Sequence, residues 1–303
     1  MRAGYTLAHV LFQMISRLST LTLAFSAISL SADEVRIAAS DLLAEYIKAP
    51  LAAHAEVSGV DYRIESIGSL PAMEGLKAGE VDLAIVAVPE ADTFSREQFR
   101  VYPFAYDVAV IAVNESNPIN EISLESLGGI FGSNEEFNYN SWGDLGLSGW
   151  RSRSIKPIAG QVPDSVSLEL FKYTVFRGGV MKSSVDVVKD SEVEGILASD
   201  AASIAILSHI PKKKEVKALM VASSKGAPAF GPTEDNVHFG DYPIRLPFYI
   251  VFNIADEDKV QQVVRVLLDE PVAKVLNENY LVALPETVRR QLTIDLEMSE
   301  NGL

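Results

Sequence analysis

The chain has 303 residues, with 26 basic and 41 acidic side chains, no cysteine and 48% hydrophobic residues. This length suits one large domain or two ordinary ones, each with a full core. The net charge of −15 argues against nucleic acid and anionic membranes as partners, since both attract basic surfaces. The absence of cysteine excludes disulfides, thiolate catalysis, cysteine-ligated zinc and a diacylglyceryl lipoprotein anchor. The four histidines are not spaced as metal ligands, so we expect neither a metal nor another cofactor.

Residues 1–32 have the pattern of a secretory signal peptide. Arg17 precedes an apolar run at 18–30, and small residues follow it at the expected cleavage position. This run is too short to span a bilayer comfortably, although an uncleaved anchor is the alternative because residues 5–15 are also apolar. Met14 offers a second translation start. Removing residues 1–32 takes away two arginines and no acid, which changes the net charge from −15 to −17. We therefore expect a periplasmic or secreted protein.

Strands and helices alternate in the first third of the mature chain. We predict strands at Val35–Ala39, Asp61–Glu65 and Val81–Val86, with helices at Leu42–His54 and Leu70–Ala78. This alternation builds a parallel sheet with right-handed crossovers.

Two longer runs, Asp107–Asn114 and Pro247–Asn253, have the pattern of long strands that bracket a second α/β region. The other elements expected in and after this region are the segment Ile122–Phe131, strands Ile155–Ala159 and Ser203–Leu207, and helices Ser165–Val175, Ser184–Asp190, Asp256–Asp269 and Pro271–Asn279. We predict an α/β protein with a discontinuous lobe 1 (33–112 and 248–303) and a lobe 2 (113–247). Two strand-like connections between lobes make a hinge architecture.

Several segments in a fixed order carry a family resemblance. They are Gly75–Leu83 (GLKAGEVDL), Ala112–Pro118 (AVNESNP), Leu127–Gly132 (LGGIFG) followed by Trp142–Gly146 (WGDLG), and Tyr242–Tyr249 (YPIRLPFY). Together they resemble the phosphate-binding-protein-like family of ABC-transporter periplasmic solute-binding proteins, over about residues 35–285. The resemblance implies a two-lobed type II periplasmic-binding fold with two hinge-crossing strands that closes on a small ligand.

The resemblance also implies that four loops face the ligand, in chain order residues 39–42, 66–69, 86–89 and 160–165. Such ligands lie beyond the carboxyl ends of strands, where loops and helix N-termini present N–H groups to an anion. The ligand-binding residues expected on this basis are Ser40, Asp41, Ser66, Gly68, Ser69, Gly160, Asp164 and Ser165. Each has a structural alternative: Ser40 or Asp41 would cap the following helix, and the loop 66–69 would be an ordinary turn.

The sequence departs from the family pattern in two of these loops. The family commonly places a serine and a charged residue after the Val-Asp strand, where this chain has Val86 and Ala87. The family's arginine position is occupied by Ile158 or Ala159. The carboxylates of the first and fourth loops would also repel a bound anion.

These observations favour an exported protein that binds phosphate or another small oxyanion, acts as a monomer and delivers its ligand to an ABC-transporter permease. The alternative is a secreted sensor or interaction protein that keeps the fold and has lost the phosphate site. An enzyme ranks last, because no acid–base pair or nucleophile is placed by a motif. We expect the Trp142 segment to be a structural turn rather than a stacking platform.

Overall fold

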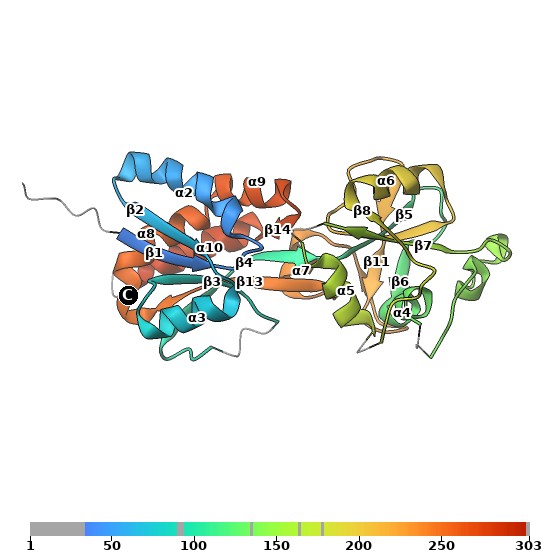
Figure 1. Cartoon of the computed structure of the whole chain (residues 1–303), viewed down its shortest axis with the longest axis horizontal. Coiled ribbons are helices and arrows are strands. Elements are labelled where there is room, and N and C mark those ends of the chain that lie inside the picture. The colour runs from blue at the N-terminus through green and yellow to red at the C-terminus, as the bar shows by residue number, and fades with distance from the viewer. Residues whose placement is uncertain (1–33, 90–93, 134–135, 163–164, 177–178, 301–303) are drawn as a thin grey trace, which may run out of the picture. The chain divides into compact units, whose positions relative to one another are not determined.

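The computed structural model describes residues 34–89, 94–133, 136–162, 165–176 and 179–300 (Figure 1). The predicted signal peptide lies outside these residues. The strands are β1 (Glu34–Ala39), β2 (Asp61–Ser66), β3 (Leu83–Ala87), β4 (Phe99–Val108), β5 (Val110–Asn114), β6 (Glu121–Ser123), β7 (Lys156–Gln161), β8 (Asp186–Lys189), β9 (Ser203–Leu207), β10 (Val216–Ala218), β11 (Met220–Ala222), β12 (Ala229–Phe230), β13 (Arg245–Asn253) and β14 (Leu281–Ala283). The helices are α2 (Ala44–Ser58), α3 (Ser69–Ala78), α4 (Leu124–Phe131), α5 (Ser167–Phe176), α6 (Asp190–Ser199), α7 (Glu234–Phe239), α8 (Glu257–Leu267), α9 (Glu270–Glu278) and α10 (Glu286–Glu300), with 3₁₀ turns η2 (Trp142–Leu145), η3 (Ser148–Trp150) and η4 (Ile254–Asp256).

The first sheet has six strands in the order β14-β4-β13-β3-β1-β2. β1 pairs in parallel with both β2 and β3, as the alternation of strands and helices predicts. β13 lies between β3 and β4 and is antiparallel to both, so a strand from late in the chain occupies the interior of the sheet.

Both faces of the sheet are covered at β1 and β3, which explains the largely apolar sequences of these two strands. In β1, Val35, Ile37 and Ala39 belong to the core that includes α2, whereas Ala38 belongs to the core beneath α3. Successive strand residues point to opposite faces, so one strand serves two helical layers. Figure 1 shows α2 and α3 on opposite sides of β1 and β3.

The second sheet has five strands in the order β10-β5-β9-β7-β8, and a three-stranded sheet, β12-β11-β6, accompanies it. The predicted strand Ser203–Leu207 is β9, and all five of its residues are buried at the sheet centre. Trp142 is also buried, and its Nε1 donates to the Ala202 carbonyl over 3.0 Å. The predicted structural turn at Trp142 is confirmed.

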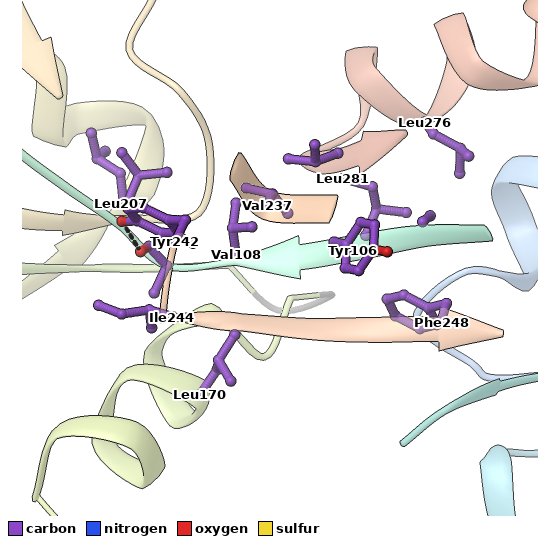
Figure 2. Close-up of a cluster of buried hydrophobic side chains, with 14 of the residues drawn as sticks. Tyr106, Val108, Leu170, Leu207, Val237, Tyr242, Ile244, Phe248, Leu276 and Leu281 are labelled. Carbon is purple, nitrogen blue, oxygen red and sulfur yellow. Dashed lines mark hydrogen bonds between the residues drawn. The ribbon is translucent and has the colours of Figure 1, made fainter. Parts of the chain in front are cut away.

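The chain passes between the two main sheets at Ala109 and again just before β13. The single strand predicted at Asp107–Asn114 is two strands, since β4 belongs to the first sheet and β5 to the second. The Ala109 N–H donates to the Ile244 carbonyl (3.1 Å), and the buried Tyr242 hydroxyl donates to the Ala109 carbonyl (2.8 Å). Figure 2 shows Val108, Val237, Tyr242 and Ile244 gathered at this passage. The two connections are therefore bonded to each other.

Other sequence predictions were wrong in detail. The helix predicted at Ser184–Asp190 is strand β8, which pairs in parallel with β7, and the helix α6 begins only at Asp190. The sheet edge beside β7 overrides the local helical spacing. The last helix, α10, was missed. Among the described residues, no helix has the length and apolarity to cross a membrane.

Candidate functional site

The carboxyl edge of the first sheet brings the first two predicted loops together. β1 and β2 are in register from Glu34 opposite Asp61 to Ala39 opposite Ser66, so both strands end at the same level. The Ile67 N–H donates to the Ala39 carbonyl (3.2 Å), and the Ser40 N–H donates to the Ile85 carbonyl of β3 (2.8 Å). Ser40 and the loop at 66–69 therefore lie on adjacent strands of one sheet edge.

The loop Ser66–Ser69 opens directly onto the N-terminus of α3. Gly68 precedes the helix at φ 83° and ψ 164°, a conformation that favours glycine, and no side chain caps the helix. A helix N-terminus leaves its first N–H groups without intrahelical partners and carries partial positive charge. Pro71 has no N–H, so Ser69 and Leu70 supply the first two backbone donors.

Ser69 is held in a fixed orientation. Its Oγ accepts the backbone N–H of Ala87 at the end of β3, over 2.9 Å. The hydroxyl hydrogen of Ser69 remains able to donate, because a serine carries one donor besides its acceptor lone pairs. The apolar Ala87 thus contributes through its backbone, a role that side-chain pattern alone could not reveal.

Ser40 and Asp41 differ in exposure. Ser40 is buried, and its carbonyl accepts from the N–H groups of Leu43 and Ala44, whereas Asp41 is exposed. The predicted helix start was two residues early, because α2 begins at Ala44 with Leu43 at its N-cap and no side-chain cap. The capping alternative for Ser40 and Asp41 is therefore wrong.

At the carboxyl edge of the second sheet, Gly160 lies close to the Asp190 side chain. A Cβ on Gly160 would lie 2.4 Å from Asp190 Oδ1 and 3.1 Å from the Ile206 carbonyl oxygen. Asp190 Oδ1 also accepts the Ser208 N–H (3.0 Å). The space that glycine leaves at this position is thus occupied by a buried carboxylate of the protein itself.

Ser165 lies at the start of α5, next to a second buried carboxylate. Its Oγ accepts the Ser167 N–H (3.1 Å), and its hydroxyl makes a long contact of 3.5 Å to Asp107 Oδ2. The Val166 N–H donates to the same Asp107 oxygen over 3.2 Å. Burial raises the pKa of Asp107 to about 7, against the opposing effect of these hydrogen bonds. The fourth-loop residue Asp164 lies outside the described residues.

The basic residues near the second sheet have structural partners. Arg245 Nη1 donates to the carbonyls of Val237 and His238, and its guanidinium lies 5.2 Å from the centre of the Tyr106 ring. Arg245 is therefore held by carbonyl groups and an aromatic ring. Lys182 Nζ donates to the Gly129 carbonyl, and burial lowers its pKa.

A histidine held by two acids was missed by sequence reasoning. His209 Nε2 lies 2.9 Å from Glu194 Oε1, and Nδ1 lies 2.9 Å from Asp190 Oδ2, the latter a charge contact rather than an aligned hydrogen bond. Burial opposes protonation of this imidazole, but the two carboxylates outweigh it and raise the pKa of His209. The Tyr280 ring packs against the His209 ring at 5.4 Å. No spacing along the chain predicts this cluster.

A cavity of about 610 Å³ adjoins the fourth loop. Its lining includes Gln161, Val162, Lys189, Asp190 and Tyr280. The side-chain amide of Gln161 thus borders a cavity where it could form a hydrogen bond with a small molecule. Within the described ranges, no three side chains among His, Asp and Glu are grouped to hold a metal ion.

Comparison with known proteins identifies the fold and the family. The model of the PBP superfamily domain matches residues 26–271. Protein SphX of Synechococcus elongatus is 27% identical over 184 residues, which are 57% of this chain and 53% of that protein, so the chain spans about half the length of this relative.

Two crystal structures share the fold. A possible phosphate binding protein from Planctomyces limnophilus has a TM-score of 0.66 at 16% identity, with 87% of this chain and 97% of that chain covered. PstS from Borrelia burgdorferi has a TM-score of 0.65 at 18% identity, with 83% and 99% covered. The predicted two-lobed α/β fold is confirmed, and the chain belongs to the PBP superfamily.

Proposed function

We propose that this protein is an exported solute-binding protein that closes two lobes on a small oxyanion, with phosphate as the first ligand to test. It works as a monomer, carries no catalytic activity and delivers its ligand to an ABC-transporter permease from the periplasm or the cell exterior. The superfamily membership and the shared fold of PstS support this class of function.

The observation that carries the proposal is the Ser66–Ser69 loop. Gly68 lets the backbone turn sharply into an uncapped helix, and Ser69 is oriented by the Ala87 N–H. Two backbone N–H groups, a hydroxyl and the positive end of α3 suit a small anion, which needs convergent donors rather than a counter-charge. Ser40 and Ser66 lie at the same sheet edge and enlarge the donor set.

Lobe closure would turn about the two connections between the main sheets. We place lobe 1 at 33–109 and 245–303 and lobe 2 at 110–244, three residues from each boundary expected from sequence. The sheet membership of β5 and β13 supports this adjustment. Two short connections that bond to each other at Ala109 can absorb a rotation as a hinge does.

A second candidate function is a secreted sensor or interaction protein that keeps the fold without the oxyanion site. Two observations favour it. Ala87 and Val88 present no polar side chain beyond β3, and the protein's own Asp107 already contacts the start of α5. The two candidates differ in whether the first-sheet loops bind an anion.

Titration calorimetry of the mature protein with phosphate, sulfate and molybdate tests the proposal. We expect one of these anions to bind more tightly than millimolar. Ser69→Ala should weaken that binding by roughly 1 kcal/mol or more, the scale of one hydrogen bond to a charged group.

Ser199→Ala is the matched control, because Ser199 donates only to the Ile196 carbonyl at the end of α6, away from both loops. Absence of binding for all three anions would favour the sensor function. Equal losses in the two serine variants would show that the anion binds elsewhere. Mass spectrometry of the secreted protein tests the predicted export, because cleavage of the signal peptide should leave an N-terminus near Asp33.

A further inference from the structure

Asp107 is a buried carboxylate at the junction between the two main sheets. It is 2% exposed and lies near the end of β4, opposite Leu246 of β13 and Leu281 of β14. Neither neighbour carries a charge. A carboxylate in such surroundings loses its hydration and requires strong local donors if it is to remain ionised.

Those donors come from the beginning of α5, 59 residues further along the chain. Asp107 Oδ2 accepts the Val166 N–H at 3.2 Å and the Ser165 hydroxyl at 3.5 Å. The other oxygen, Oδ1, is buried and has no hydrogen-bond partner among the described residues. The carboxylate thus lies where α5 would otherwise offer its free N–H groups to a ligand.

We propose that Asp107 is a built-in anion that occupies the donors of the second sheet, so that an external oxyanion is bound through the loops of the first sheet alone. Asp107 is then a specificity-determining residue, because its charge and position exclude a second anion from α5. The binding of an external anion by the first-sheet loops rests on the proposed function, whereas the occupation of the α5 donors by Asp107 does not.

Among the residues that the structure describes, no basic side chain forms an ion pair with Asp107. Tyr106 and Val108 point to the opposite face of β4. The Arg245 guanidinium lies over the Tyr106 ring, and the Tyr106 hydroxyl contacts His238 Nδ1 at 2.9 Å. Directly before α5, the Ser165 hydroxyl and the Val166 N–H contact the carboxylate.

The test combines variants that remove the Asp107 carboxylate with an NMR measurement of the contact between Asp107 and Val166. Asp107→Ala removes the built-in anion and frees the donors of Ser165 and Val166. We expect phosphate or sulfate to bind this variant at least about tenfold more tightly than wild type, the gain of one charge-assisted hydrogen bond. In Asp107→Ala/Ser165→Ala, most of that gain should disappear. Asp186→Ala is the control for net charge, since Asp186 is exposed on β8 and should leave the affinity unchanged.

The second reading uses no ligand. In wild type, the NMR shift of the Val166 amide should titrate with a midpoint near pH 7, because its acceptor gains a proton, and Asp107→Asn should abolish that titration. A Val166 amide shift that is the same in wild type and Asp107→Asn at every pH, or an Asp107→Ala variant that folds and binds phosphate and sulfate with wild-type affinity, overturns the proposal. A wild type that binds no anion, together with an Asp107→Ala variant that does, would refute the proposed function and support the occupation of the α5 donors by Asp107.

Discussion

The carboxyl edges of the two main sheets share a local sequence pattern but differ in what contacts the helix that follows. In both, parallel strands lead through small polar residues into a helix, at Ser66–Ser69 before α3 and at Ser165 before α5. At the first edge the helix has no side-chain cap, and Ser69 is oriented by a backbone N–H. At the second, Asp107 contacts the start of α5 and Asp190 fills the space beside Gly160. If the proposed function is correct, the same local pattern leaves backbone donors available at the first edge, whereas Asp107 already occupies those at the second.

The largest expected effect comes from neutralising Asp107. Its pKa in the folded protein is about 7, above the ordinary 3.8, so the folded state binds the proton more tightly than the unfolded chain. Stability from this group is therefore fully present below about pH 4 and is lost as pH rises toward 7, by up to roughly 4 kcal/mol. Asp107→Asn should lack this loss, as urea unfolding of both proteins between pH 4 and pH 8 would show. If the free energies of unfolding of wild type and Asp107→Asn change equally with pH, Asp107 is not the charge that occupies the start of α5.

A smaller effect is expected from crowding the second edge. Gly160→Ala would place a methyl group 2.4 Å from Asp190 Oδ1 and 3.1 Å from the Ile206 carbonyl oxygen, so the carboxylate that accepts the Ser208 N–H would have to shift. Overpacking of this kind costs about 1–3 kcal/mol.

The matched control is Gly149→Ala, since nothing lies within 4 Å of a Cβ built on Gly149. Thermal unfolding should separate the two variants. If both melt alike, Asp190 does not close on Gly160 as the structure indicates.

The smallest effect is expected at the open edge. Gly68 has φ 83°, so Gly68→Ala should destabilise the protein by about 1 kcal/mol through backbone strain alone, with only Pro71 Cδ near the added methyl, at 3.9 Å. Gly75→Ala in the same helix meets only ordinary contacts with Val81 and should be neutral or slightly stabilising. Denaturant midpoints of the pair measure this contrast. A stabilising Gly68→Ala would show that the loop does not hold the conformation needed to face an anion.

The elements that sequence predicts best are those whose environment is uniform along the segment. Ser203–Leu207 was predicted to the residue, because a central strand needs apolar side chains on both faces. Asp186–Lys189 was assigned to a helix, because its pairing partner β7 lies about 30 residues away and leaves no local mark. The position of Asp107 at the start of α5 could not be predicted for the same reason, since its contact with Val166 joins residues 59 apart.

The interior position of β13 in the first sheet has a consequence for the order of folding. Every strand of the five-stranded sheet falls between residues 110 and 218, whereas β13, which joins β3 to β4, ends at Asn253. The five-stranded sheet can therefore complete its pairing while the six-stranded sheet is still split into two parts, and closing the longer loop costs more entropy. Pulsed hydrogen exchange during refolding should protect the amides of β9 before those of β3. The part of the protein that closes its own anion site would thus be the first to become rigid.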